Sequence, residues 1–105
     1  MKCKVIWSDF SEAQLDLIFE YYSVEASTKV ATKVVRNLIA KAERLSNNPY
    51  MGAVEELLLN RKDQYRFLVY KNYKIIYSVD EQNSIVKIAD VFDTRQNPEK
   101  IKRNG

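Results

Sequence analysis

The sequence contains no histidine, and this absence restricts its chemistry more than any other feature of its composition. Without imidazole, the chain has no histidine to serve as a general base, a general acid or a metal ligand. Cys3 is the single cysteine, so an internal disulfide is impossible and zinc and transition-metal sites are excluded in practice. We therefore expect neither a metal nor a cofactor.

Glycine is scarce as well, and long apolar runs are missing. Gly52 is the only internal glycine, so no glycine-rich loop is available to cradle a phosphate. No apolar run approaches the length of a membrane span. Polar Ser8 and Asp9 follow the first seven residues, which leaves no room for the apolar stretch of a signal peptide. With one thiol in addition, a cytoplasmic protein with no membrane association is the default expectation.

The chain has enough residues for one domain, which we assign to residues 1–105. Hydrophobic residues make up 46% and charged residues 30%, as in soluble globular proteins. Residues 61–105 contain ten basic and six acidic side chains, a net charge of +4, while the first 60 residues sum to −1. A basic C-terminal half favours nucleic acid or an acidic protein as partner, although slightly basic domains without such partners are equally common.

A short strand at Lys4–Trp7 and a first helix are predicted near the N-terminus. Apolar residues at helical spacing place this helix at about Ser11–Tyr22. Ser8 or Ser11 is the expected N-cap, and Ser11 with Gln14 fits a capping box.

A second, longer helix begins at Ser27 or Thr28 and ends before Asn47-Asn48-Pro49. The link between the two helices is short, so they should lie antiparallel as a hairpin. The apolar stripe of the second helix comprises Ala31, Val34, Val35, Leu38, Ala42 and Leu45.

Strand-like segments fill the rest of the chain. Pro49–Gly52 is predicted to be a turn, and Val54–Leu59 either a helical turn or an extended segment. Three strands follow, at Tyr65–Tyr70, Tyr73–Val79 and Ser84–Asp93. The order β-α-α-β-β-β predicts an α+β fold, with a short N-terminal strand and an antiparallel helical hairpin packed on one face of an antiparallel sheet.

The pairing of the first two of these strands decides which side chains share a face. A loop with an odd number of residues, Lys71-Asn72-Tyr73, places both apolar rows on the helix side. Arg66 and Lys74 then share the outer face, and Arg95, just past the last strand, lies beside them. This pairing predicts that the three cations converge, whereas Tyr77 belongs to the core and Glu55 and Glu56 are surface acids.

The segments "YRFLVYKNYKIIYSVD" (residues 65–80) and "IADVFDTRQNP" (residues 88–98) resemble the RelE/ParE superfamily of bacterial toxins from type II toxin–antitoxin modules. The resemblance spans nearly the whole chain. Its most specific marks are the run Tyr73–Tyr77 and Arg95 near the end of the last strand. The RelE-like branch cleaves mRNA in the ribosomal A site, and the ParE-like branch inhibits DNA gyrase by binding.

By this resemblance, Arg66, Lys74 and Arg95 match cations that hold phosphate in the nucleases. Leu68 stands where those enzymes tend to have a second lysine, and Phe92 where many relatives carry histidine. Since the proton-transfer groups are missing, a ParE-like toxin is favoured. The alternatives are a ribosome-dependent mRNA endonuclease, with the three cations as its candidate catalytic residues, and a non-toxic, degenerate binding module.

The resemblance also implies partners. A cognate acidic antitoxin neutralises such toxins, and operator DNA is bound only indirectly, through the antitoxin. The implied roles are growth inhibition and plasmid stabilisation in bacteria. The residues expected to bind the target or the partner are Arg66, Tyr70, Lys74, Arg95, Lys100 and Lys102.

Overall fold

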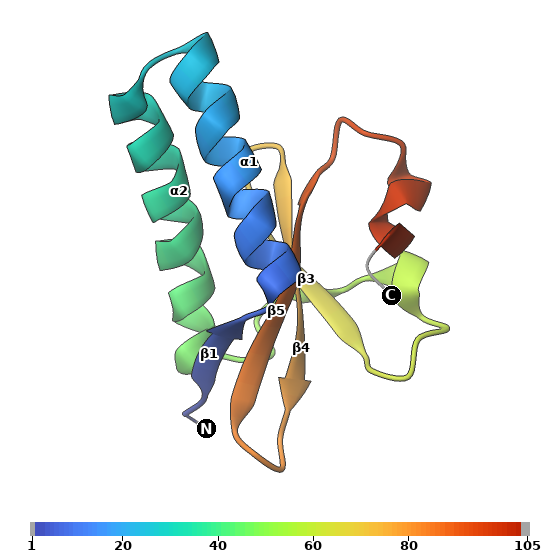
Figure 1. Cartoon of the computed structure of the whole chain (residues 1–105). Helices are drawn as coiled ribbons and strands as arrows, with labels where there is room; N and C mark the ends of the chain where they lie inside the picture. Colours follow the sequence, from blue (N-terminus) through green and yellow to red (C-terminus); the bar gives the residue numbers. More distant parts are fainter. Residues whose placement is uncertain (1, 104–105) are drawn as a thin grey trace.

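Five strands form one sheet, and two long helices cover one of its faces (Figure 1). The computed structural model describes residues 2–103. No helix in this range is long and apolar enough to cross a membrane. The elements are β1 (Lys4–Trp7), α1 (Asp9–Glu25), α2 (Thr28–Glu43), η1 (Arg44–Ser46), β2 (Ala53–Val54), η2 (Glu56–Leu58), β3 (Tyr65–Tyr70), β4 (Tyr73–Asp80), β5 (Ile85–Asp93) and η3 (Pro98–Arg103).

The sheet confirms the predicted α+β class, with strand order β1-β5-β4-β3-β2. Neighbouring strands are antiparallel except for β1, which runs parallel to β5 along Ile85–Ile88. Val54–Leu59 was predicted as either a helical turn or an extended segment. The structure has a short strand followed by a helical turn here, with β2 at Ala53–Val54 and η2 at Glu56–Leu58. The predicted strand at Tyr65–Tyr70 is confirmed residue for residue.

Serine side chains start both helices. Ser8 caps α1, because its Oγ accepts a hydrogen bond from the Ser11 N–H at 3.1 Å. The predicted capping box of Ser11 and Gln14 is therefore wrong. The Ser11 hydroxyl is buried and donates to the carbonyls of Ser8 and Ile88. Ser27 caps α2 in the same way, through the N–H of Val30 at 3.1 Å.

The larger hydrophobic core lies between the helical hairpin and the sheet. Apolar residues of both helices contact one face of β4 and β5, and Trp7 of β1 packs at the border of this cluster. The largest side chains of this cluster with essentially no exposure are Tyr77, Leu38, Leu45, Ile75, Ile88, Val34 and Val86. The predicted stripe of α2 and the core position of Tyr77 are confirmed.

The register predicted for β3 and β4 is wrong. Tyr70 pairs with Tyr73 and Arg66 with Tyr77, so the hairpin has the two-residue turn Lys71-Asn72. Lys71 has a φ of 53°, the left-handed conformation that primed two-residue turns require at their first central position. An odd loop suits a sheet with only one buried face.

The second face is buried too. Leu58 of η2 and Ile101 of η3 contact Ile76 and Phe92 of the sheet, and all four are at most 5% exposed. Both short helices therefore lie on the side of the sheet opposite the hairpin (Figure 1). Because apolar side chains are needed on both faces, the real register splits the apolar rows instead of gathering them on one side.

Gly52 is fixed by its surroundings. A Cβ at this position would lie 2.6 Å from the Phe67 carbonyl oxygen and 2.7 Å from the Tyr77 hydroxyl. The Gly52 N–H also donates to that hydroxyl at 2.9 Å. The loop between α2 and β2 therefore approaches the sheet closely only because this residue has no side chain.

We expect Gly52→Ala to lower the free energy of unfolding by about 2 kcal/mol, because a methyl group overpacks the contact with backbone and a buried phenol. Chemical denaturation monitored by circular dichroism measures the change. Ala53→Ser, at the exposed neighbouring residue, should change it by less than about 0.5 kcal/mol. Equal stability of Gly52→Ala and the wild type would contradict the close approach.

Candidate functional site

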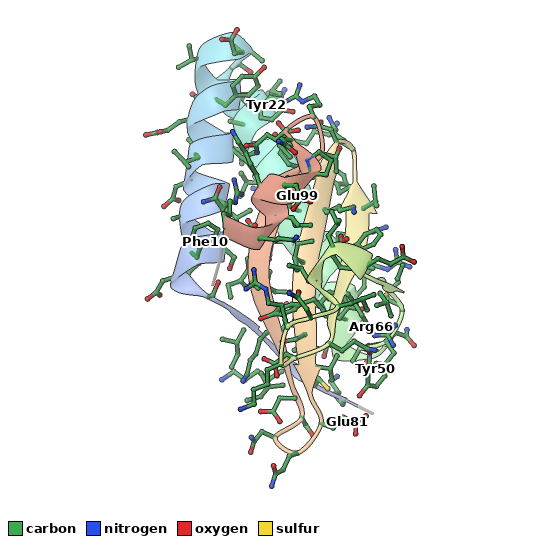
Figure 2. All side chains as sticks on the ribbon, turned by 90° about the vertical axis from the view of Figure 1, so that its right-hand side faces the viewer. Phe10, Tyr22, Tyr50, Arg66, Glu81 and Glu99 are labelled. Carbon is green, nitrogen blue, oxygen red and sulfur yellow. The ribbon has the colours of Figure 1, made fainter. Side chains whose placement is uncertain are left out.

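Arg66 binds the loop before β2. Its guanidinium donates to the Gly52 carbonyl at 2.9 Å and to the Gln64 side chain at 3.3 Å, and it lies 5.2 Å from the ring centroid of Tyr50 (Figure 2). Because Arg66 pairs with Tyr77, its side chain belongs to the helix-side row of the sheet. Arg66 therefore joins the loop to β3.

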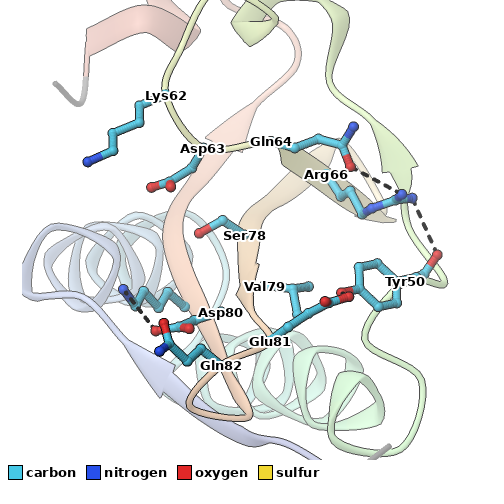
Figure 3. A pocket seen from close by; sticks show the side chains of 11 residues that line it. Tyr50, Lys62, Asp63, Gln64, Arg66, Ser78, Val79, Asp80, Glu81 and Gln82 are labelled. Carbon is cyan, nitrogen blue, oxygen red and sulfur yellow. Dashed lines mark hydrogen bonds and ion pairs between the residues drawn. The ribbon is translucent and has the colours of Figure 1, made fainter.

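A cleft of about 740 Å³ lies beside Arg66, at the end of β4 (Figure 3). It contains cations and acids in equal number, namely Lys62, Arg66, Lys87, Asp63, Asp80 and Glu81. The Tyr50 hydroxyl donates to Glu81, and this hydrogen bond raises the pKa of Tyr50 to about 12. A phenol with this pKa is a poor general base near neutrality, and the mixed charges do not select an anion.

Lys74 lies on the opposite face of the sheet from Arg66. Its Nζ is 2.8 Å from Oε2 of Glu55 and 4.2 Å from the ring centroid of Phe67. Glu55 is only 3% exposed, so the prediction that it is a surface acid is wrong. A buried carboxylate requires a partner, and Lys74 supplies it.

Arg95 is paired with Asp93 at the other end of the sheet. The guanidinium donates two hydrogen bonds to the carboxylate in a bidentate arrangement, from Nη2 to Oδ2 at 2.8 Å and from Nε to Oδ1 at 3.0 Å. Asn72 also donates to Oδ1 at 3.1 Å. The hydrogen bonds from Arg95 lower the pKa of Asp93 to about 2, although burial of the carboxylate acts in the opposite direction and raises the pKa.

The predicted convergence of the three cations is wrong. Arg66 and Lys74 occupy opposite faces, because a shift of register by one residue moves a side chain to the other face. Arg95 follows Asp93, which pairs with Tyr73, four residues along β4 from the partner of Arg66. That separation is roughly 13 Å along the strand. No shared phosphate site results.

The other predicted site residues have varied surroundings. The Tyr70 hydroxyl accepts a hydrogen bond from Asn37 of α2 at 3.0 Å, and its ring packs against the larger core. Lys100 is exposed on η3. Lys102 pairs with Glu99 at 2.9 Å on the same short helix.

The sequence did not predict a role for Arg103, whose contacts hold η3 against the rest of the chain. Its guanidinium contacts the buried carboxylate of Asp90 at 3.0 Å and lies within 5.5 Å of the ring centroids of Phe10 and Phe92. It also donates to the Gln14 side chain of α1 at 3.2 Å. Only the folded topology places a C-terminal arginine on α1, so nothing local in the sequence signals these contacts.

A groove of about 330 Å³ lies between α1 and the segment after β5, and we call it the α1–β5 groove. Tyr73 lies at the groove, and burial together with a hydrogen bond to Tyr22 raises the pKa of this phenol. The groove thus combines apolar, phenolic and guanidinium groups, a composition suited to protein partners. Its lining comprises Gln14, Leu17, Ile18, Tyr21, Tyr73, Val91, Asp93, Arg95, Gln96 and Arg103.

Comparisons with known proteins identify relatives. Residues 5–98 match the family model described as ParE toxin of type II toxin–antitoxin system, parDE. A chain of the solved structure described as a chromosomal ParDE TA system from P. aeruginosa has a similar fold, with a TM-score of 0.72 and 18% identity. The match covers 88% of this chain and 96% of that chain. A comparison with curated proteins found no match.

The Asp93–Arg95 pair should make stability depend on pH in the acid range. The pKa of Asp93 falls from 3.8 to about 2 on folding, so the pair stabilises the fold above pH 4 and this stabilisation is lost as the pH falls through 2. The shift corresponds to about 2.4 kcal/mol. Because the Arg95 side chain is 59% exposed, screening reduces the expected effect to about 1 kcal/mol.

Denaturation of the wild type and Asp93→Asn at pH 7 and pH 2 measures this contribution. The difference of about 1 kcal/mol at pH 7 should fall to a small fraction of that value at pH 2, where the Asp93 carboxyl of the folded protein is about half protonated. Asp63→Asn is the control, because Asp63 is exposed and has no ion pair among residues 2–103. A difference that persists unchanged in acid would show that Asp93 acts through something other than its charge.

Lys74→Met should lower the free energy of unfolding by about 3 kcal/mol, because it leaves the buried charge of Glu55 without a partner. The double variant Lys74→Met, Glu55→Gln removes both charges and should come within about 1 kcal/mol of the wild type. Thermal and chemical denaturation of the four proteins give the coupling energy. If the single variant is as stable as the wild type, Lys74 has no structural role and is free to contact a target.

Proposed function

The chain belongs to the ParE toxin family of type II toxin–antitoxin systems, and we propose that it inhibits growth by binding its target, without cleaving RNA. The observation that carries this proposal is the separation of Arg66, Lys74 and Arg95. Each cation contacts a different part of the chain, and the two of them that lie on strands face opposite sides of the sheet.

Cleavage of RNA through the 2′-hydroxyl needs a group that takes its proton and groups that stabilise the charge on phosphorus. The chain has no histidine, and Phe92, where many relatives carry one, is buried in the second apolar cluster. Ile101 of η3 contacts the same cluster, so η3 covers the face on which an RNA strand would lie. These features favour binding over catalysis.

DNA gyrase is the target that the family resemblance implies, and we propose it for this toxin. The alternatives are a ribosome-dependent mRNA endonuclease and a binding module without toxicity. A bacterial, cytoplasmic setting follows from the same proposal, because both gyrase and ribosomes are cytoplasmic.

A cognate acidic antitoxin is the second part of the proposal. Exposed apolar side chains follow one another along α1 at helical spacing, with Leu17 57%, Tyr21 48% and Val24 82% exposed. Such a stripe on a protein with net charge +3 suits a partner that is both acidic and apolar. Binding of operator DNA would then come from the antitoxin, with the toxin attached to it.

Two assays on the purified toxin test this function. We expect it to inhibit gyrase supercoiling and to leave mRNA on programmed ribosomes intact. Addition of the antitoxin in equal amount should restore supercoiling, which controls for contaminants. Cleavage on ribosomes without gyrase inhibition would support the endonuclease, and inertness in both assays with tight antitoxin binding would support the non-toxic module.

A further inference from the structure

Basic side chains without a partner in the chain gather on α2, although the C-terminal half of the sequence is the more basic one. None of the five basic residues between positions 29 and 44 makes an ion pair or a side-chain hydrogen bond with another of residues 2–103. They are Lys29, Lys33, Arg36, Lys41 and Arg44. Most of the cations from residue 61 onwards do have such partners, namely Arg61, Arg66, Lys74, Lys87, Arg95, Lys102 and Arg103.

Four of the five form one row on the outer side of the helix. At 3.6 residues per turn they fall within a sector of about 80°, opposite the side of α2 that packs on the larger core. Arg44 continues the row, because this residue follows α2 with a helical φ of −62° and ψ of −23°. The row is roughly 22 Å long. We call it the α2 basic face, and its members, all exposed, are Lys29, Lys33, Arg36 and Arg44.

Lys71, in the turn between β3 and β4, adds a cation beside this face. The Asn37 side chain of α2 donates to the Tyr70 hydroxyl at 3.0 Å, and the Lys71 Nζ lies 5.9 Å from the centroid of the Tyr70 ring. Lys71 is exposed and has no ion pair among the residues that the structure describes. Since Asn37 is one turn of helix from Lys33, the turn lies next to the middle of the row.

The α2 basic face is open and its charge is not neutralised within the chain. Figure 1 shows α2 on the outside of the helical hairpin, with none of the drawn helices or strands beyond it. Glu43 is the only acidic residue of α2. Like charges four residues apart, such as Lys29 and Lys33, repel each other on a helix. A bound anion would relieve this repulsion.

The composition of the row favours a phosphate backbone over a protein. Its middle is Ala40, and the exposed aliphatic residues Val30 and Ile39 fall outside the sector. Protein interfaces need an apolar or aromatic centre, and single-stranded nucleic acid is held by stacking on aromatic rings. Duplex phosphates need only cations at intervals. A row of this length spans about six phosphates of one strand.

We propose that the α2 basic face, together with Lys71, binds the phosphate backbone of duplex DNA independently of its sequence. The choice of DNA over duplex RNA rests on the proposed function, because gyrase acts on duplex DNA. This contact differs from recognition of the operator, which needs contacts with bases. A toxin with such a surface meets gyrase together with the DNA that the enzyme holds.

Fluorescence anisotropy tests the contact, with purified toxin titrated into a labelled DNA duplex of about 20 base pairs at several salt concentrations. We expect dissociation constants of about 1–100 μM, the same within twofold for two unrelated sequences. Neutralisation of about five phosphates predicts that a plot of log affinity against log salt has a slope of about −4.5.

A matched pair of double variants locates the contact. Lys33→Gln with Arg36→Gln should weaken DNA binding at least tenfold and make the salt slope shallower by about 2. Lys4→Gln with Lys62→Gln changes the net charge equally and should weaken binding less than threefold. Both control residues are exposed and have no ion pair in the described part of the chain. Lys4 points away from the helices, because its neighbour Val5 packs on the larger core. Circular dichroism confirms that all variants are folded.

Four outcomes would overturn the inference. Equal weakening by the two double variants would show that only net charge matters. Absence of DNA binding by a toxin that still inhibits gyrase would remove this contact and leave the proposed function standing. Tighter binding of an RNA duplex of the same length would replace DNA as the ligand. Loss of antitoxin binding in the α2 variant, without DNA binding by the wild type, would make the face a protein interface.

Discussion

Burial of both faces of one small sheet is the constraint on which the rest of the structure depends. The helical hairpin covers one face, and two short helices, η2 and η3, cover the other. Each face therefore requires its own apolar row along β4 and β5, with Ile75 and Tyr77 on one side and Ile76 on the other. The two-residue turn at Lys71-Asn72 sets the register that satisfies both faces.

The burial of both faces also explains why the predicted cations form ion pairs instead of a shared anion site. On a solvated outer face, a lysine on the central strand would be available to bind an anion. Here the covering elements bring Glu55, 3% exposed, against Lys74, and Arg103 against the equally buried Asp90. Cations under a covering layer stabilise buried carboxylates. The Arg95 side chain, at the end of the sheet, is 59% exposed, against 24% for Lys74 and 27% for Arg103.

Much of the fold is predictable because it is local. Period-3.6 stripes, capping serines and the run Tyr65–Tyr70 determine elements through neighbours in sequence, and the structure confirms them. The site was not predictable in the same way. The register depends on whether η3 covers the outer face, and η3 is held by contacts of Arg103 with residues up to 89 positions away. The composition of η3, Pro-Glu-Lys-Ile-Lys-Arg, shows only one apolar residue, too weak a signal for a covering element.

Because η2 and η3 cover the outer face of the sheet, that face is not available to a partner. A sheet with both faces buried has only its edges and the outer sides of its helices left for partners. β2 pairs with β3 only at Arg66 and Phe67, and β1 pairs with β5 only along Ile85–Ile88. Among residues 2–103, two stretches of these edges have no neighbouring strand. They are residues 68–70 of β3 and residues 90–93 of β5, and the second lies beside exposed apolar residues of α1. Short edges protect a protein from unwanted pairing, and the two uncovered stretches of this sheet are three and four residues long.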